Sequence, residues 1–362
     1  MILGKTLSLY FSRQFLRASL SVFVTIFTLA YTLDFVELMR RTSETPNTGA
    51  WLLALLSLFR IPIVAEQVVP FAVLFGSLAA FLNLNRKLEL VVTRAAGVSA
   101  WQFSLPGILV AFFLGLFAVT VYNPVAVMMK RQGDAIEGRI FGRNGVGSSE
   151  NGAWIRQKSV DGDAIVRAEK ILDRDDAFGG VTAFVFYPDG KFQERIEAPS
   201  ATLKPGYWQF EKARVLAVGN EPAVYDTYLM ATNLTATQIK ASLTPTETVS
   251  FWELPQLVER LQLAGLETTR YRLRYQSLLA RPLLLIAMVF VAASVSLRFF
   301  RFGGVARMVL GGVVAGFMLY VATEVAEDLG SAGVISAVVA SWTPAFIGSL
   351  LGVLALLYQE DG

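Results

Sequence analysis

The amino-acid sequence predicts a membrane protein of mixed α and β structure, with six transmembrane helices in a 3+3 arrangement around an inserted antiparallel β domain. The chain has 362 residues, of which 54% are apolar and only 17% charged, too apolar a balance for an ordinary soluble domain. Charged residues gather instead in one block. Residues 131–250 hold 14 of the 32 Lys/Arg and 16 of the 29 Asp/Glu, so this block is predicted to be a soluble insertion between two groups of spans.

Six stretches are apolar and long enough to cross a hydrocarbon core of about 30 Å, which takes roughly 20 helical residues. They lie near 16–39, 61–82, 101–124, 278–298, 305–326 and 334–358. The first should remain as a membrane helix, because its apolar run exceeds the roughly 7–15 residues of a signal peptide. Gly312 and Gly316 in the fifth stretch form a small-xxx-small pattern, which permits close contact between helices.

A short charged stretch, 84–97, separates the second and third spans. Its apolar residues recur with helical spacing and predict one amphipathic helix with a single apolar stripe; they are Leu84, Leu88, Val91, Val92 and Ala95. Arg86, Glu89 and Arg94 lie off the stripe, and Gly97 is a helix stop. The helix either lies on the bilayer surface or is a coupling helix that seats in a groove of a soluble motor protein.

The insertion 131–250 has strand-like segments at 153–156, 164–168, 181–187 and 215–218. Turn signals separate them, namely Asp161-Gly162, Pro188-Asp189-Gly190, Pro205-Gly206 and Gly219-Asn220. Short strands at this spacing indicate an antiparallel sandwich, jelly roll or barrel, with Trp154 and Trp208 as core candidates and Phe184 and Phe186 as further ones. An amphipathic helix over 253–263 then leads back to the membrane. The domains are therefore 1–130, 131–250 and 251–362.

Basic residues predict the orientation. Nine of them lie in short segments on one side of the predicted membrane: Lys5, Arg13, Arg17, Arg86, Lys87, Arg94, Arg298, Arg301 and Arg307. Positive charge is enriched on the cytoplasmic side, so we expect both termini and the 84–97 stretch in the cytoplasm and the insertion on the other side. The absence of cysteine means that the insertion needs no disulfides.

The opposite side also carries basic residues, although positive charge there is disfavoured during insertion. Arg40, Arg41, Lys130 and Arg131 are the candidates for binding a substrate; Arg60, Arg270, Arg272, Arg274 and Arg281 lie at the same side. One interpretation is snorkelling, or pairing with Glu37, Glu44 and Glu66. The other is a basic ring for an anionic amphiphile, because guanidinium groups suit phosphate through forked hydrogen bonds.

An aromatic stripe precedes Arg40 in the first span. Phe23, Phe27 and Tyr31 recur at i, i+4 and i+8. The stripe either packs against another helix or guides acyl chains toward the arginines.

Catalytic chemistry is nearly excluded. The chain has neither histidine nor cysteine, so it cannot use a general-base histidine or a thiolate nucleophile, and it cannot form the usual zinc sites. Gly4-Lys5-Thr6 mimics the end of a phosphate-binding loop, but the glycine that should stand five residues earlier is missing. We expect no cofactor, no metal and no nucleic-acid partner, and any ATP hydrolysis must occur on another subunit.

Several motifs carry a resemblance to a known family. They are Tyr10 with Arg13, the 35–41 segment that ends the first span, Ile61-Pro62 and Val69-Pro70-Phe71, and above all the 89–99 string ELVVTRAAGVS. With the 3+3 topology around a β insertion, the whole chain resembles the YjgP/YjgQ permeases, the LptF and LptG subunits of the bacterial lipopolysaccharide exporter. The paired arginines after Phe35 and the LELVV spelling are more similar to the LptG branch.

The resemblance implies an inner-membrane protein of a Gram-negative bacterium with a periplasmic β-jellyroll domain. It implies extraction of lipopolysaccharide from the outer leaflet and transfer to a periplasmic bridge. The implied partners are an LptB-type ATPase dimer, an LptF-type permease, and LptC and LptA-type jellyroll proteins. Coupling to the ATPase would involve Arg86, Glu89 and Arg94, and the gates in the first and fifth spans would involve Phe23, Phe27, Tyr31, Phe317 and Tyr320. Arg40, Arg41 and Arg131 would meet anionic groups of the lipid.

Other classes share some of these features. An LptF-type paralogue, or a permease for another anionic amphiphile or lipoprotein, would have the same topology and would differ in bound ligand. A membrane-anchored receptor or scaffold would need neither the coupling helix nor the outer arginines, and no ATPase would purify with it.

Overall fold

The structure is a computed structural model. It describes residues 4–42, 49–141, 153–159, 162–172, 177–187, 189–219, 221–235, 238–239, 244–300 and 305–361. The chain forms two compact units. One, here the helical unit, comprises Met1–Gly133, Ser250–Trp252 and Arg272–Gly362; the other, here the β unit, comprises Asp134–Val249 and Glu253–Tyr271.

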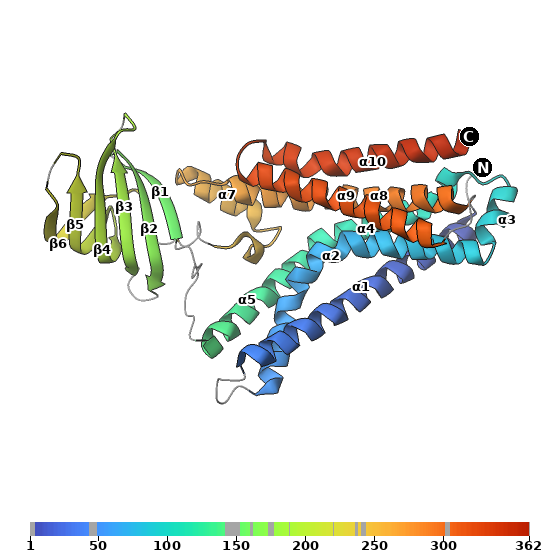
Figure 1. Ribbon diagram of the computed structural model, residues 1–362, viewed down its shortest axis with the longest axis horizontal. Coiled ribbons are helices and arrows are strands. Elements are labelled where there is room, and N and C mark those ends of the chain that lie inside the picture. Colours follow the sequence, from blue (N-terminus) through green and yellow to red (C-terminus); the bar gives the residue numbers. More distant parts are fainter. Residues whose placement is uncertain are drawn as a thin grey trace. The chain divides into compact units, whose positions relative to one another are not determined.

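The six predicted spans are confirmed as helices that are long and apolar enough to cross a membrane. Their bounds are α1 (Lys5–Thr42), α2 (Ala50–Arg86), α4 (Ala100–Phe117) continued by α5 (Asn123–Phe141), α8 (Thr269–Phe300), α9 (Val305–Ser331) and α10 (Ala337–Asp361). Between α4 and α5 the helix widens into a π turn, η1 (Ala118–Tyr122). A short helix, α3 (Glu89–Ala95), follows α2. The start of α1, the short helix α3 and the C-terminal end of α10 all lie at the same end of the helical unit (Figure 1).

Small residues let these helices approach closely, as is usual where lipid removes the hydrophobic drive for association. A Cβ on Gly76 of α2 would lie 2.3 Å from the Ser19 Cα of α1, and one on Gly115 of α4 would lie 2.5 Å from the Pro282 Cα of α8. The predicted pattern at Gly312 and Gly316 makes its close contact within this chain, because both glycines face the tips of leucines on α2.

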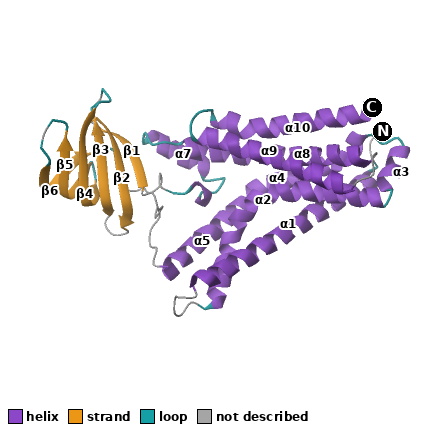
Figure 2. Ribbon diagram, in the orientation of Figure 1, coloured by secondary structure: helices purple, strands orange, loops and turns teal. Residues whose placement is uncertain are grey.

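The six described strands all belong to the β unit (Figure 2). They are β1 (Ala153–Ser159), β2 (Gly162–Leu172), β3 (Ala177–Phe186), β4 (Phe192–Lys204), β5 (Tyr207–Ala217) and β6 (Ala223–Ala231). They form one sheet in the order β1-β2-β3-β4-β5-β6, every pair antiparallel. The predicted antiparallel insertion is confirmed, and its connectivity among the described strands is a meander rather than the Greek key of a jelly roll. The predicted helix at 253–263 is also confirmed as α7 (Leu254–Leu263).

The sheet curls so that side chains from distant strands meet on one face. Gln157 on β1 accepts a hydrogen bond from the Trp208 indole of β5 at 3.1 Å and donates one to the Ala231 carbonyl of β6 at 3.1 Å. Trp208 is fully buried, as predicted, and packs on Phe178 with ring centroids 5.1 Å apart. The same prediction for Trp154 is wrong, because its side chain faces outward and lies under the Arg167 guanidinium.

Candidate functional site

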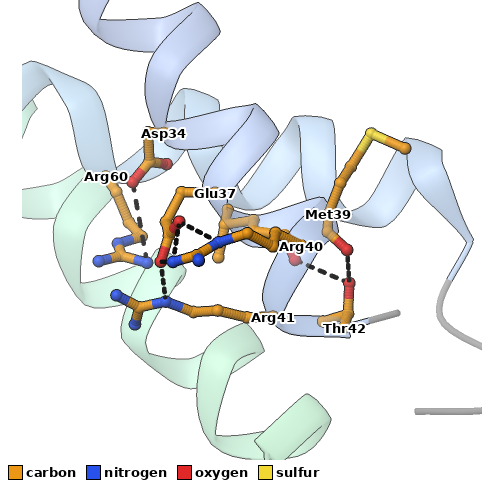
Figure 3. A network of polar contacts seen from close by, with 8 residues as sticks. Asp34, Glu37, Met39, Arg40, Arg41, Thr42 and Arg60 are labelled. Carbon is orange, nitrogen blue, oxygen red and sulfur yellow. Dashed lines mark hydrogen bonds and ion pairs between the residues drawn. The ribbon is translucent and has the colours of Figure 1, made fainter. Parts of the chain in front are cut away.

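The last turn of α1 carries a cluster of charged side chains. Figure 3 shows Glu37 between two guanidinium groups: Arg40 Nε donates to it at 2.9 Å and Arg41 Nε donates to it at 2.7 Å. On the neighbouring helix α2, Arg60 lies 4.0 Å from an Asp34 carboxylate oxygen. Three guanidiniums and two carboxylates thus lie close together at the facing ends of α1 and α2.

The two terminal arginines remain accessible in spite of this pairing. The side chains of Arg40 and Arg41 are 77% and 59% exposed. Water screens ion pairs between exposed side chains, so Glu37 holds these guanidiniums weakly. Pairing with Glu37, one of the two interpretations offered for the arginines, is thus observed, and Glu44 lies outside the described residues. A role in substrate binding stays a prediction.

The other two predicted substrate residues lie on α5, where Lys130 is half-buried and Arg131 is exposed. One turn further on, a Cβ on Gly133 would lie 3.3 Å from the Phe59 Cβ and 3.6 Å from the Arg60 Cγ. The helix α5 therefore packs on the turn of α2 that also carries Arg60. This contact brings the two predicted pairs of basic residues toward the same end of the helical unit.

The aromatic stripe of α1 is half-buried and makes contacts with neighbouring helices. The Phe23 ring centroid lies 6.0 Å from that of Tyr122 and 6.2 Å from that of Phe27, and the Tyr31 hydroxyl donates to the Ala54 carbonyl at 3.4 Å. The contacts of Phe23 and Tyr31 agree with the packing interpretation, and guidance of acyl chains by the stripe stays a prediction. The exposed apolar face of α1 consists of other residues, including Leu20, Val24, Leu33 and Val36.

On α9, the two predicted gate residues differ in environment. Phe317 is exposed. Tyr320 is half-buried and packs against Phe71 of α2 with ring centroids 5.0 Å apart.

A second charged cluster is buried in the helical unit around Glu66 of α2, which has no exposed surface. Its carboxylate accepts hydrogen bonds from Arg274 at 3.0 Å, from Arg281, and from the Asn123 amide at 2.9 Å. The Asn123 carbonyl oxygen in turn accepts from the Phe251 backbone N–H at 2.9 Å. One carboxylate thus joins α2, α5, α8 and the 250–252 segment.

The surroundings of this buried cluster are also hydrogen-bonded. Trp252 Nε1 donates to the Thr120 carbonyl in the π turn at 3.1 Å, and the Tyr122 hydroxyl donates to the Pro62 carbonyl at 2.9 Å. On the other side, Ser277 donates to Glu327 of α9 at 2.5 Å. Buried ion pairs and π turns both concentrate at functional sites of membrane proteins.

The predicted continuous helix over 84–97 is wrong. Helix α2 ends at Arg86, Leu88 has a φ of +59°, and α3 spans only Glu89–Ala95. A residue in the left-handed region interrupts the helical hydrogen-bond ladder and changes the chain direction. The predicted stripe is split as a result: Leu84 is a buried residue of α2, whereas Leu88, Val91, Val92 and Ala95 are exposed.

Exposed apolar groups of α3 lie next to a half-buried carboxylate. Leu88 and Val92 are 61% and 66% exposed. Glu89 is half-buried: the Tyr10 hydroxyl of α1 donates to its Oε1 at 3.1 Å, and its Oε2 is buried without a hydrogen-bond partner among the described residues. We call Leu88, Glu89, Val91 and Val92 the α3 patch. Its composition fits a protein surface that presents an apolar groove and a basic residue.

The remaining predicted coupling residues flank this patch. Arg86 is exposed at the end of α2. Arg94 belongs to α3, but its side chain lies outside the described residues.

Six apolar helices with buried charges and an inserted sheet define a multi-pass membrane protein. The chain belongs to the family described as the lipopolysaccharide export system permease LptF/LptG, whose model matches residues 9–358. It is similar to the lipopolysaccharide export system permease protein LptG of Escherichia coli strain K12, with 23% identity over 321 residues that cover 84% of this chain and 86% of the relative. It is also similar to the lipopolysaccharide export system permease protein LptG of Haemophilus influenzae, with 22% identity over 366 residues that cover 97% of this chain and 96% of the relative.

Family membership makes this chain a permease subunit of a transport system rather than an enzyme. Both relatives carry the LptG name, which agrees with the branch that the paired arginines and the LELVV segment favour.

Proposed function

We propose that this chain is the permease subunit of an inner-membrane ABC transporter that extracts lipopolysaccharide from the outer leaflet and passes it toward a periplasmic bridge. The observation that carries the proposal is the pair of exposed arginines, Arg40 and Arg41, at the end of a helix whose membrane-spanning part is apolar and little buried. An amphiphile with phosphate groups and acyl chains matches both parts of that helix.

The geometry of α1 supports this match. Leu33, Val36 and Arg40 follow one another at spacings of three and four residues, so they lie on one face of the helix. Leu33 and Val36 are both exposed. Acyl chains on these side chains would place a phosphate at the guanidinium of Arg40. A phosphate presents several oxygens, so it would accept forked, charge-assisted hydrogen bonds from the guanidinium of Arg40.

The α3 patch is proposed to dock an LptB-type ATPase dimer. An even number of spans puts both termini on one side, and α3 lies at that same end of the helical unit (Figure 1). The basic residues listed for this side favour the cytoplasm. Glu89 would meet a basic residue of the ATPase, while Leu88 and Val92 would enter its groove.

The remaining parts of the transporter follow from the family. An LptF-type permease would complete the membrane path, and the β unit would face the periplasm and contact LptC and LptA-type proteins. Its curled sheet with a largely apolar inner face suits the passage of acyl chains.

The test is transfer of lipopolysaccharide by the reconstituted complex. Changing Arg40 and Arg41 together to glutamate should abolish extraction and the lipid-stimulated part of ATP hydrolysis, while basal hydrolysis and assembly persist. Changing both to lysine should retain most extraction, because the charge is kept while the forked geometry is lost. Extraction at the normal rate by the glutamate variant contradicts the proposal, and extraction of a lipoprotein instead supports the alternative permease class.

A further inference from the structure

A cavity of about 470 Å³ lies between α1 and α2 near the end that carries α3. Its polar lining consists of Gln14 and Arg17 of α1 and Asn83 and Arg86 of α2; Ala79 and Leu82 are among its apolar residues. Arg17, Ala79 and Arg86 are exposed. The cavity therefore opens to the outside of the helical unit.

Both arginines of this cavity are free to bind a ligand. Within the described part of the chain, neither Arg17 nor Arg86 has a hydrogen bond or ion pair. In this respect they differ from Arg40, Arg41, Arg274 and Arg281, each of which pairs with a carboxylate. None of the described residues that line the cavity is acidic, so these residues give it a positive charge.

The arginines also lie at the depth of a lipid headgroup. Arg17 stands at the start of the apolar run of the first span, and Arg86 stands a turn beyond the apolar run of the second. From Arg17 along α1, Leu20 and Val24 follow at spacings of three and four residues and are 55% and 53% exposed. A polar, basic mouth thus continues into an exposed apolar row on one helix face.

We propose that this cavity binds the headgroup of an anionic phospholipid. Its phosphate lies between the guanidiniums of Arg17 and Arg86, the amides of Gln14 and Asn83 contact the glycerol region, and one acyl chain follows Leu20 and Val24. Forked hydrogen bonds from arginine favour a phosphate, and the apolar row favours a lipid over a free phosphate. The site is distinct from the arginines at the other end of α1, and its occupancy does not depend on the proposed export of lipopolysaccharide.

The experiment measures lipid bound to the purified transporter complex by native mass spectrometry, after exchange into detergent with added phosphatidylglycerol or phosphatidylcholine. The unaltered complex should retain phosphatidylglycerol in preference to phosphatidylcholine. Changing Arg17 and Arg86 together to glutamine should lower the bound phosphatidylglycerol at least about tenfold, since two charge-assisted contacts are lost. The matched control changes Arg13 and Arg307, two exposed arginines outside the cavity, to glutamine and should retain the lipid.

Two further arms separate the alternatives. Ala79→Phe fills the cavity from its wall and leaves both arginines in place, so it should also lose the lipid. An excess of inorganic phosphate should leave the bound phosphatidylglycerol in place; displacement by phosphate alone assigns the site to a free anion and overturns the lipid proposal. Equal retention by the arginine double variant and the control overturns the site itself. Because the readout is bound lipid, a failure of lipopolysaccharide export leaves this result unaffected.

Discussion

Removal of the Glu66 carboxylate is the perturbation with the largest effect expected from this structure. Glu66 is fully buried and accepts hydrogen bonds from two guanidiniums and one amide. In Glu66→Ala, Arg281 and Arg274 keep their charges but lose their shared counter-ion. Breaking a buried ion pair by removing one partner costs about 3–5 kcal/mol, and we expect Glu66→Ala to fall in this range.

The two arginines should matter unequally. The Arg281 side chain is 9% exposed and that of Arg274 is 20% exposed, so water screens Arg274 better. After Arg281→Gln, Glu66 still has Arg274 and Asn123 as partners. The predicted order of destabilisation is therefore Glu66→Ala, then Arg281→Gln, then Arg274→Gln.

A charge-neutral combination tests the electrostatic reasoning directly. Glu66→Gln alone leaves two unbalanced guanidiniums, whereas Glu66→Gln with Arg274→Gln and Arg281→Gln leaves hydrogen-bonding amides and no charge. Replacing a whole buried ionic cluster by neutral groups is often nearly neutral in stability. The triple variant should therefore be more stable than Glu66→Gln alone, a non-additivity typical of residues in one network.

The assay is thermal unfolding of the purified protein in detergent, followed by tryptophan fluorescence. Glu66→Ala should lower Tm by roughly 5–10 °C, on the scale of a few degrees for each kcal/mol in a chain of this size. A Tm for Glu66→Ala within about 1 °C of the original, or a triple variant less stable than each single one, refutes the account of the cluster.

Three further changes test other parts of the molecule. Glu89→Lys should weaken ATPase binding, since like charges across an interface cost several kcal/mol. The control Tyr10→Phe keeps the Glu89 charge and should bind the ATPase normally. Normal binding by both variants rules out the proposed docking. A photo-crosslinker at Val185, which is buried on the inner face of the sheet, should capture lipopolysaccharide when ATP is supplied. One at the neighbouring, outward-facing Phe184 should not. Capture of protein alone at both positions indicates that the β unit is a docking platform. Gly76→Ala should destabilise the protein by about 1–3 kcal/mol, because its Cβ meets the Ser19 backbone, and a Tm equal to that of the original contradicts this close approach.

Apolar length and charge placement made most of the fold predictable from the sequence. All six spans were foreseen, and most of the helices extend beyond the apolar run predicted for them. In the sheet, β4 and β6 were missed. Pro199 interrupts the strand pattern of β4, and the register passes from Gly179–Ser200 to Val181–Ala198 without pairing Gly180 with Pro199. A strand that contains proline is ordinarily discounted.

The structure of the charged sites was harder to predict from the sequence than the spans were. The periodicity of 84–97 predicted one helix because a regular pattern cannot reveal that Leu88 adopts a positive φ. The arginines of α8 were grouped with the outer basic residues by their place in the sequence. In the structure Arg274 and Arg281 pair with Glu66, from which they are separated by 208 and 215 residues of sequence. Which of several acidic residues these arginines pair with depends on tertiary packing.

The helix α2 connects these features, and its contacts constrain how the helical unit can move. Spanning 37 residues, it is about 55 Å long at 1.5 Å per residue. Along its length it carries Arg60, the buried Glu66, and Gly76 in close contact with α1. A shift of α2 against α1 or α8 must break the Gly76 packing or the hydrogen bonds of Glu66. The turn at Lys87 and Leu88 bears neither constraint, but α3 is itself held to the helical unit, because Leu90 is buried in the core and Tyr10 of α1 donates to Glu89. Larger displacements that begin at α3 must therefore carry α1, α2 and α8 together.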